Sequence, residues 1–442
     1  MIIKQFEYKP LAHYSYAIVS DGEMAIIDPE RSPLEYYEFA IENNAKIIAV
    51  IETHPHADFV SSHLQIHEET GAAIYNSENL GADYPHKTFD EGDSFSIGNI
   101  DVSAINTPGH SPDSITVVAK EDEQTVLFTG DTLFIGDVGR PDLREKAGKM
   151  TAKRQELAEM MYNTILHKFN HLPDDALVYP AHGAGSLCGK NMSSDKSSTL
   201  GNERIGNWAF KNQTKEEFVN TLLDSQPFIP SYFGYNVDIN KSGAENVRKA
   251  TSNIVFKLNT TVEGLIIDTR NEGDFKNGHL PGSINIQATS KNDKFETWLG
   301  SIVEPNERFH LVIDKPNDLN NLLERVSKIG YETQLISIIT LSKERLIKSA
   351  NLNLGDFKNN PSNYTIVDIR NQSEINDGKF FEQAITHPLN ELRNTMHEIP
   401  TGKPIVVHCA GGYRSAAGSS ILESGLNNTI IFDLSEDVKK FT

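Results

Sequence analysis

Short apolar runs separated by polar turns fill the chain up to residue 181 and predict alternating strands and helices. YAIVS (16–20) and MAIID (24–28) flank an Asp-Gly turn and predict a hairpin. LEYYEFAIENN (34–44) has helical spacing, whereas IIAVIET (47–53) is typical of a buried strand. The same pattern predicts strands at 101–107, 114–120, 125–130 and 176–181 and a long helix near 151–170.

Four side chains that can bind a metal share one position, just past the carboxyl end of an expected strand: His54, His110, Asp131 and His182. The carboxyl ends of strands are where α/β folds place their sites. Such a regular placement is harder to explain by chance than any single histidine. The four residues therefore predict a metal centre.

The run HPHADF (54–59) carries two histidines and an aspartate at alternating positions: His54, His56 and Asp58. In metal-dependent hydrolases such a run usually continues with one more histidine, and here Phe59 takes that place. Two histidines and one carboxylate with open coordination positions suit a mononuclear Fe(II) site that handles dioxygen. Zinc binds the same residue types equally readily, so the ligand types leave the metal open.

The second half of the chain begins with a polar segment and then repeats itself. Residues 211–252 are polar and are broken by Pro227 and Pro230, so they predict an edge helix followed by a linker. Beyond them, LIIDTRNEGDFKNG (265–278) and TIVDIRNQSEINDG (365–378) align without a gap at an offset of 100 residues. Each copy adds a second buried strand and a helix, which indicates two copies of one α/β domain.

In the second copy, VVHCAGGYRS (406–415) predicts a buried strand, then Cys409, a glycine-rich loop and a helix. This geometry points backbone N–H groups and a helix N-terminus at the sulfur, and Arg414 adds positive charge. Both effects favour the thiolate, which is the nucleophilic and sulfur-carrying form. The residues between the cysteine and the arginine form the expected sulfur cradle: Ala410, Gly411, Gly412 and Tyr413.

The length of this loop separates two families. Tyrosine phosphatases have five residues between cysteine and arginine, whereas this chain has four, and the smaller cradle resembles that of rhodanese sulfurtransferases, whose cysteine carries a persulfide. The first copy has Asp314-Lys315-Pro316 after its second strand, with neither a cysteine nor a glycine cradle. We therefore expect the first copy to fold but to be catalytically silent, as a spacer or an assembly surface.

Composition narrows the classes of partner. The 442 residues correspond to roughly three domains at about 150 residues per domain. A formal net charge of −20 argues against nucleic acid and anionic membranes, because nothing would release phosphate counterions. No apolar run reaches the about 18 residues of a membrane span, and the N-terminus lacks the features of a signal peptide. Cys188 and Cys409 are the only cysteines, which excludes a disulfide framework and predicts a cytoplasmic protein.

Residues 1–235 resemble the persulfide dioxygenases of the metallo-β-lactamase superfamily, through the runs ETHPHADF, NTPGHSPDSI, LFTGDTLFIGDVGRPDL and YPAHGAGSLCGKNM. The rhodanese-fused branch of that family also has phenylalanine at the place of Phe59. The resemblance implies one Fe(II) per chain with three protein ligands: His54, His110 and Asp131. It implies that three further residues orient ligands, hydrogen-bond water or help to transfer protons: His56, Asp58 and His182.

Two more residues near this expected site each allow two interpretations. Arg140, in GDVGRPDL (136–143), either binds a substrate carboxylate or persulfide or lies in a surface salt bridge. Cys188, in GSLCGK, is either a small buried packing residue or a reactive thiol beside the iron that carries sulfur.

These features predict an α/β multidomain protein, in which a metallo-β-lactamase αββα sandwich precedes two α/β rhodanese-like domains with parallel sheets. The expected boundaries are 1–235 for the sandwich, 236–252 for a linker, 253–352 for an inactive rhodanese-like domain and 353–442 for an active one. The resemblance implies oxidation of a low-molecular-weight thiol persulfide by O2 to sulfite. It also implies that Cys409 transfers sulfane sulfur to give thiosulfate, in sulfide detoxification. Fused enzymes of this kind often self-associate, so we expect a homo-oligomer, a dimer or a tetramer.

Two other functions stay open on the sequence alone. A glyoxalase II-like thioesterase with zinc or iron, fused to a sulfurtransferase, uses a second metal to activate water, and Phe59 disfavours that metal. A sulfur carrier or sensor would use the metal domain only as a scaffold, which the open triad and the thiolate loop disfavour.

Overall fold

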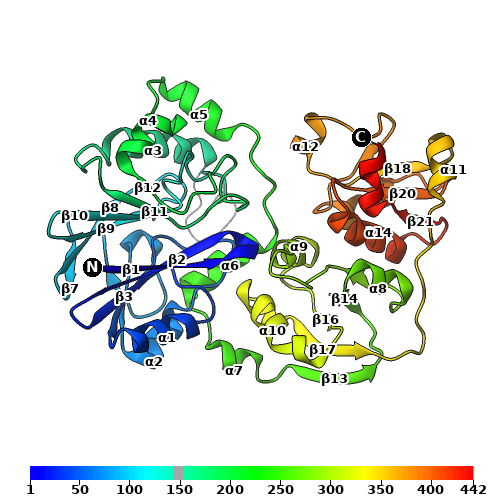
Figure 1. Cartoon of the computed structure of the whole chain (residues 1–442), viewed down its shortest axis with the longest axis horizontal. Helices are drawn as coiled ribbons and strands as arrows, with labels where there is room; N and C mark the ends of the chain where they lie inside the picture. Colours follow the sequence, from blue (N-terminus) through cyan, green and yellow to red (C-terminus); the bar gives the residue numbers. More distant parts are fainter. Residues whose placement is uncertain (144–152, 442) are drawn as a thin grey trace. The chain divides into compact units, whose positions relative to one another are not determined.

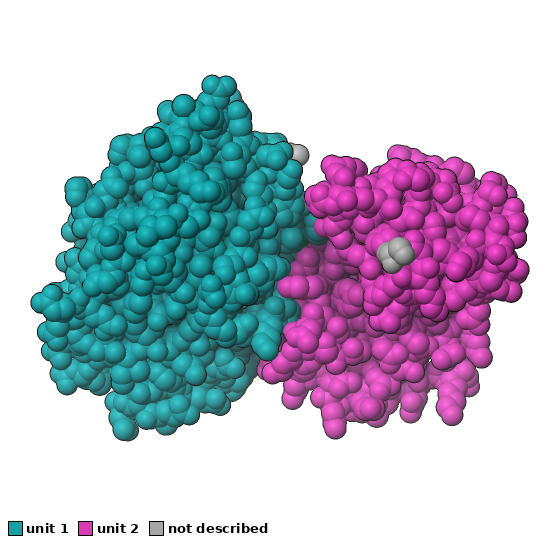
Figure 2. All heavy atoms as spheres, turned by 45° about the horizontal axis from the view of Figure 1, so that its top comes forward, with its two compact units in different colours: residues 1–250, 327–330 teal, residues 251–326, 331–442 magenta. Residues whose placement is uncertain are grey.

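The computed structural model describes residues 1–143 and 153–441, and the chain divides into two compact units (Figure 2). Unit 1 comprises residues 1–250 together with 327–330, and unit 2 comprises residues 251–326 and 331–442. None of the helices in the described part of the chain is both long and apolar enough to cross a membrane.

Two mixed sheets form the centre of unit 1 (Figure 1). The first runs in the order β1 (Ile2–Tyr8), β2 (His13–Ser20), β3 (Glu23–Ile27), β4 (Lys46–Ile51), β5 (Ala73–Asn76) and β6 (Lys87–Thr88). The second runs in the order β12 (Ser198–Thr199), β11 (Leu177–Pro180), β10 (Gln124–Gly130), β9 (Ile115–Glu121), β8 (Ile100–Asn106) and β7 (Ser94–Ile97). The expected hairpin is present as the antiparallel pair β2 and β3.

Helices cover the outer face of each sheet, which makes unit 1 the predicted αββα sandwich. Apolar side chains such as Ile18, Val117 and Phe128 fill the space between the sheets. The helices α1 (Leu34–Glu42) and α2 (His63–Thr70) pack on the first sheet, and α3 (Arg154–His167), α4 (Leu200–Gly206) and α5 (Lys215–Leu223) pack on the second. Helix α3 lies within the expected range of 151–170, of which residues 151 and 152 lie outside the described residues. Each fully buried aliphatic or aromatic side chain stabilises this arrangement by about 1.5–3 kcal/mol.

The segment expected as a linker, 236–252, is largely helical, and its residues up to 250 belong to unit 1. It contains most of α6 (Tyr232–Ser242) and all of α7 (Val247–Thr251), with only a short break between them. Phe233 and Val237, four residues apart, are buried on one face of α6. Asn240 on the same helix is also buried, and its side chain donates hydrogen bonds to two backbone carbonyl oxygens of the histidine motif. These bonds make the burial of a polar side chain possible. The polar composition of this segment suggested a linker, but the polar side chain of Asn240 is buried with hydrogen-bond partners inside unit 1.

Unit 2 contains two sheets in which all neighbouring strands are parallel. The first has the order β13 (Val255–Thr260), β17 (Leu335–Leu341), β16 (Phe309–Val312), β14 (Leu265–Asp268) and β15 (Ile284–Asn285). The second has the order β19 (Ile385–Thr386), β18 (Thr365–Asp368), β20 (Ile405–His408) and β21 (Ile431–Asp433). The helices are α8 (Glu272–Asn277), α9 (Phe295–Ile302), α10 (Leu319–Lys328), α11 (Leu354–Asn359), α12 (Gln372–Asn376), α13 (Leu392–Thr395) and α14 (Tyr413–Gly425).

Short 3₁₀ helices complete the connections in the described residues of both units. They are η1 (Lys9–Leu11), η2 (Glu78–Leu80), η3 (Trp208–Phe210), η4 (Pro316–Asp318), η5 (Tyr331–Thr333), η6 (Pro361–Asn363), η7 (Met396–Glu398) and η8 (Ser435–Phe441).

The internal repeat corresponds to one local structure built twice. Asp268 and Asp368 are buried at the ends of β14 and β18, and each is bound by the arginine two residues later, at 2.6 Å between Nη2 and Oδ2. The same guanidinium groups donate to the carbonyl oxygens of Gly278, at 2.8 Å, and Gly378, at 2.9 Å. The Asp-x-Arg pattern therefore closes the turn after the first strand in both copies.

Candidate metal centre and sulfur-transfer loop

Three of the expected metal ligands converge in unit 1. His54 follows β4, His110 follows β8 and Asp131 follows β10, and all three are buried. The Nε2 atoms of His54 and His110 lie 3.7 Å and 3.5 Å from Oδ2 of Asp131. One ligand atom from each residue lies within 4.8 Å of the others, which is the spacing of side chains that can share one ion.

The hydrogen bonds around this triad fit a bound cation. Nδ1 of His54 contacts the Thr53 hydroxyl at 3.0 Å, and Nδ1 of His110 donates to the Arg140 carbonyl oxygen at 2.8 Å. Both rings are thus held with Nε2 toward Asp131, as expected for metal ligands oriented by outer partners. Both carboxylate oxygens of Asp131 are buried without a hydrogen bond, which is costly for a charged group unless a cation compensates it.

A second group of donors adjoins the first. Asp58, His182 and Cys188 also bring one ligand atom each within 4.8 Å of one another. Nε2 of His182 lies 3.5 Å from Oδ2 of Asp58 and 3.7 Å from Oδ1 of Asp131, so Asp131 faces both groups. Burial raises the pKa of the Cys188 thiol well above its usual value, and the Asp131 and Asp58 carboxylates raise it further. Cys188 is therefore both a buried residue and a neighbour of the candidate metal centre.

His56 belongs to a different cluster. Its Nε2 atom lies 3.1 Å from Asp28 and 3.4 Å from Glu52. Burial by itself lowers the pKa of His56, but these two carboxylates raise it to about 10. Asp28 also accepts hydrogen bonds from the backbone N–H and the hydroxyl of Thr53, at 2.7 Å and 2.9 Å, and so supports His54 through its neighbour. Sequence reasoning missed Asp28 and Glu52, although both are acidic residues at the ends of apolar strands.

Phe59 fills the place next to the histidine motif with an aromatic ring. The ring is fully buried and packs against His13 and His56, with centroid distances of 3.9 Å and 4.4 Å. The Asn240 side chain donates to the carbonyl oxygens of His56 and Phe59, each at 2.8 Å. The phenyl group therefore leaves the motif with one possible ligand fewer.

Arg140 lies in a salt bridge, as one of the two interpretations of the sequence held, but the pair is buried rather than on the surface. It is buried, and its Nε and Nη2 atoms donate to Asp142 at 2.7 Å each, while Nη1 donates to the Leu187 carbonyl oxygen at 3.1 Å. Its backbone N–H donates to the Cys188 carbonyl oxygen at 3.0 Å. These bonds hold the guanidinium in place, and a role of Arg140 in substrate binding stays a prediction. Arg140 also fixes the segment that carries Cys188 beside the backbone that holds His110.

The sulfur-transfer loop in unit 2 has the predicted order of strand, cysteine, loop and helix. Cys409 directly follows β20, is buried, and accepts a 3.2 Å hydrogen bond at Sγ from the backbone N–H of Gly412. Gly412 has a φ of 104°, a conformation that favours glycine, and its carbonyl oxygen accepts a 2.8 Å hydrogen bond from the Ser415 hydroxyl. The main chain thus supplies a donor to the sulfur at the start of α14.

Arg414 forms an ion pair with Glu374, a residue that the sequence analysis did not single out. Both terminal nitrogens of Arg414 donate to Glu374 at 2.6 Å. Burial by itself raises the pKa of Glu374, but the Arg414 guanidinium holds it below its usual value. Arg414 also interacts with Cys409. Because Glu374 binds the arginine on two sides, the arginine is fixed beside the sulfur rather than free in solution.

The strand register changes which residue of the first copy corresponds to Cys409. Asp268 pairs with Val312, and Asp368 pairs with His408, so the next residue along each strand is Ile313 in the first copy and Cys409 in the second. The expectation had placed Asp314 there, one residue too late. Ile313 is buried and has no sulfur, so it cannot carry sulfane sulfur either.

Comparison with known proteins now adds to this geometry. Residues 8–182 match the Metallo-beta-lactamase superfamily. A crystal structure of a metallo-beta-lactamase from Staphylococcus aureus subsp. aureus COL is 30% identical and has a TM-score of 0.68, covering 77% of this chain and 99% of that one. The chain belongs to the metallo-beta-lactamase superfamily. In this superfamily member, residues 254–339 and 353–442 match the Rhodanese-like domain, so two rhodanese-like domains follow the sandwich.

Curated relatives of this superfamily member include proteins with different named activities. Persulfide dioxygenase ETHE1 of Homo sapiens is 27% identical over 162 residues, which cover 36% of this chain and 59% of that protein. A hydroxyacylglutathione hydrolase of Rhizobium etli is 34% identical over 164 residues, which cover 36% of this chain and 57% of that protein. The chain thus spans less than two thirds of the length of either relative. Similarity alone does not separate a dioxygenase from a hydrolase.

Proposed function

We propose that the chain is a bifunctional enzyme, a persulfide dioxygenase fused to a thiosulfate-forming sulfurtransferase, with one Fe(II) held by His54, His110 and Asp131. The overall first reaction converts a thiol persulfide, O2 and water into the thiol, sulfite and protons. We propose that residues 1–235 carry this reaction, that 353–442 carry sulfur transfer and that 253–352 form a silent repeat. Sulfide detoxification is the physiology that this pair of reactions serves.

One observation carries the dioxygenase half of the proposal. Both Asp131 carboxylate oxygens are buried without a hydrogen bond beside two fixed imidazoles. Phe59 takes the position in the histidine motif at which hydrolases usually have a further histidine. Two imidazoles and one carboxylate suit a mononuclear Fe(II) site with open positions. The similarity to persulfide dioxygenase ETHE1 supports the same assignment.

The chain's own residues divide the work around this site. Bound Fe(II) supplies open coordination positions and redox chemistry with dioxygen. Thr53 and the Arg140 carbonyl oxygen keep the two histidine rings oriented. His182, between Asp58 and Asp131, holds a proton at Nε2 and can exchange it at the edge of the site. Phe59 excludes water from the side that it covers.

The sulfur-transfer half rests on Cys409. Its thiolate attacks the terminal sulfur of a second persulfide, so the bond between the two substrate sulfurs breaks, the thiolate leaves and Cys409 becomes a persulfide. Sulfite then attacks that terminal sulfur, which forms thiosulfate and restores the Cys409 thiolate. The Gly412 N–H stabilises negative charge on Sγ at the beginning and the end of this cycle.

The products of a thiol persulfide test the proposal. With Fe(II)-loaded protein in the presence of oxygen, we expect sulfite to appear first and thiosulfate to appear at its expense while persulfide remains. Sulfite without thiosulfate would contradict the sulfur-transfer half. Thiosulfate formation only from added sulfite would contradict the dioxygenase half.

A second candidate function has an observation of its own. The group formed by Asp58, His182 and Cys188 adjoins Asp131 and offers donors for a second metal, which a hydroxyacylglutathione hydrolase-like thioesterase would use to activate water. This candidate requires two bound metals per chain and hydrolysis of a glutathione thioester. A metal content of one per chain with no thioester hydrolysis would exclude it.

A further inference from the structure

The first rhodanese-like repeat, which lacks a sulfur carrier, contacts the sulfur cradle of the second repeat within unit 2. Tyr413, the last cradle residue before Arg414, donates from its hydroxyl to the carbonyl oxygen of Gln287 at 2.9 Å. Burial raises the pKa of Tyr413 well above its usual value, so the hydroxyl keeps the proton that it donates. One side of the cradle is therefore anchored on the first repeat.

The other side of the cradle is backed by the first turn of η8, which begins at Ser435. A Cβ atom at Gly412 would lie 3.0 Å from the backbone nitrogen of Glu436 and 3.2 Å from the carbonyl carbon of Ser435. Ser435 has a φ of 50°, and its hydroxyl contacts both carboxylate oxygens of Glu272, at 2.8 Å and 2.9 Å. The turn that limits the position of Gly412 is thus held by a residue of the first repeat.

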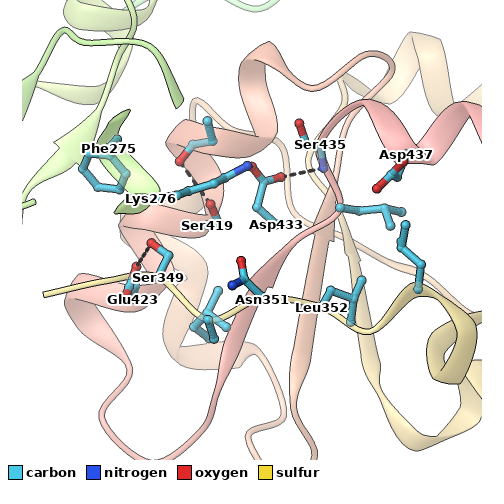
Figure 3. Close-up of a pocket in the computed structure, with 15 residues that line it drawn as sticks. Phe275, Lys276, Ser349, Asn351, Leu352, Ser419, Glu423, Asp433, Ser435 and Asp437 are labelled. Atoms are coloured by element: carbon cyan, nitrogen blue, oxygen red, sulfur yellow. Dashed lines mark hydrogen bonds and ion pairs between the residues drawn. The ribbon is translucent and has the colours of Figure 1, made fainter. Parts of the chain in front are cut away.

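A partly buried ion pair holds the same turn. Asp433 accepts a 2.8 Å hydrogen bond from the backbone N–H of Ser435, and Lys276 of the first repeat lies 2.7 Å from Asp433 and 2.8 Å from Glu272. Figure 3 shows Lys276 and Asp433 reaching toward each other beside Ser435, along a cavity lined by both repeats. The turn is therefore bound from its side chain and from its backbone.

Gln287 connects the two anchors. Its side-chain oxygen accepts a 3.0 Å hydrogen bond from the backbone N–H of Glu272, while its own carbonyl oxygen accepts the Tyr413 hydroxyl. Gly412, whose N–H bonds to Cys409 Sγ, lies in the chain directly before Tyr413 and against Ser435. Both contacts of the first repeat thus meet at Gly412, which donates its N–H to the sulfur.

We propose that the silent repeat positions the sulfur cradle, with Glu272 and Gln287 as positioning residues that act on Cys409 through Ser435, Tyr413 and Gly412. This inference rests on the proposed role of Cys409 as the sulfur carrier. It gives the first repeat a function in the second repeat's chemistry, beyond that of a spacer. Removing either anchor loosens Gly412 and weakens the hydrogen bond that favours the thiolate.

The test uses the full-length chain with Glu272→Ala and Tyr413→Phe, and measures how alkylation of Cys409 by iodoacetamide depends on pH. Peptide mass mapping separates Cys409 from Cys188. Because the thiolate is the reacting form, we expect the midpoint of alkylation to move upward by about one pH unit in each variant. At a pH well below both midpoints, alkylation is then about tenfold slower than in the wild-type chain.

Glu307→Gln is the matched control. Glu307 of the first repeat binds Arg393 of the second at 2.7 Å and 3.0 Å, so this variant also weakens a contact between repeats, but the contact is not on the cradle. We expect its alkylation profile to stay at the wild-type midpoint. An equal shift in the control would mean that the first repeat acts only by holding the second in place.

Two further results would overturn the inference. If Glu272→Ala and Tyr413→Phe both keep the wild-type profile, the first repeat does not position the sulfur. If Glu272→Ala does not fold, which thermal unfolding detects, the conservative Tyr413→Phe variant alone decides. Alkylation needs neither metal nor persulfide, so a failure of the proposed dioxygenase leaves this test intact.

Discussion

The candidate metal centre and the sulfur-transfer loop are built in opposite ways. The metal centre gathers side chains from the ends of three strands, and Asp131 contributes two buried oxygens that no hydrogen bond satisfies. The sulfur loop is one continuous segment, in which the main chain from Cys409 to Gly412 supplies the contact to sulfur. A convergent site depends on each distant side chain, whereas a contiguous one depends on the shape of its loop. Single substitutions should therefore separate the two activities.

The largest expected effect is that of Cys409→Ser, which should abolish sulfur transfer and leave the reaction with oxygen unchanged. Cys409→Ser should lower thiosulfate formation from persulfide and sulfite by about 10³-fold or more, because no nucleophilic sulfur carrier remains. Oxygen uptake with persulfide should stay at the wild-type level, since Cys409 belongs to the other site. Parallel assays of thiosulfate and oxygen check this. A variant that still forms thiosulfate at the wild-type rate would contradict the assignment of Cys409.

The converse substitution acts on the metal centre. Asp131→Ala should reduce metal affinity by about 100-fold or more and abolish oxygen uptake, because the only carboxylate of the triad is removed. Sulfur transfer from persulfide to added sulfite should persist. Metal content after dialysis gives the measurement.

Asp58→Ala is the matched control for this experiment, since Asp58 lies beside the triad without belonging to it. We expect a smaller loss of metal affinity, of about 10-fold. Equal losses in the two variants would indicate that both donor groups hold the metal, which favours the two-metal hydrolase.

The stability of the domain that carries the sulfur loop should depend on its buried Asp-x-Arg pair. Asp368→Asn should lower the free energy of unfolding of unit 2 by about 3–5 kcal/mol, because it leaves Arg370 buried without its carboxylate. Asp268→Asn should cost less, since 12% of the Arg270 side chain is exposed compared with 6% for Arg370. Urea denaturation of the two variants measures the difference. A larger loss for Asp268→Asn would contradict this explanation.

A smaller, pH-dependent effect concerns His56 beside the metal centre. Its folded-state pKa of about 10 lies above the unfolded value, so its contribution is complete below pH of about 6.5 and is lost as pH rises toward 10. We expect unfolding of unit 1 to become easier by about 2 kcal/mol between pH 7 and pH 9. His56→Gln should flatten this slope. An unchanged slope in the variant would show that another group causes it.

The contrast between the two sites also explains what the sequence predicted well. The order of strand, Cys409 and glycine loop is contiguous, so residue types alone indicated the local structure that is observed. The convergence of His54, His110 and Asp131 was also expected, because each follows the carboxyl end of a strand. The structure adds that these strands belong to both sheets: β4 lies in the first, and β8 and β10 lie in the second. The resemblance to the metallo-β-lactamase superfamily implied the αββα sandwich, and the internal repeat with its resemblance to rhodaneses implied the two parallel sheets of unit 2.

The features that the sequence did not predict are a strand register and two side-chain contacts, all of which are fixed only in the folded chain. The apolar run HLVI (310–313) does not reveal how its strand pairs with the neighbouring strand. The sequence therefore suggested that the position of Cys409 corresponds to Asp314, whereas the strand pairing shows that it corresponds to Ile313. Arg140 had a partner two residues away, Asp142, but only the folded loop brings them together. The contact of Glu272 with Ser435 spans 163 residues and leaves no local pattern.

Oxygen uptake by anaerobically Fe(II)-loaded protein on addition of a thiol persulfide, with metal content determined on the same sample, tests the central claim most directly. The account predicts oxygen consumption in proportion to persulfide, with about one iron per chain. Absence of oxygen uptake, together with thioester hydrolysis and two metals per chain, would contradict it and would assign the sandwich to a hydrolase.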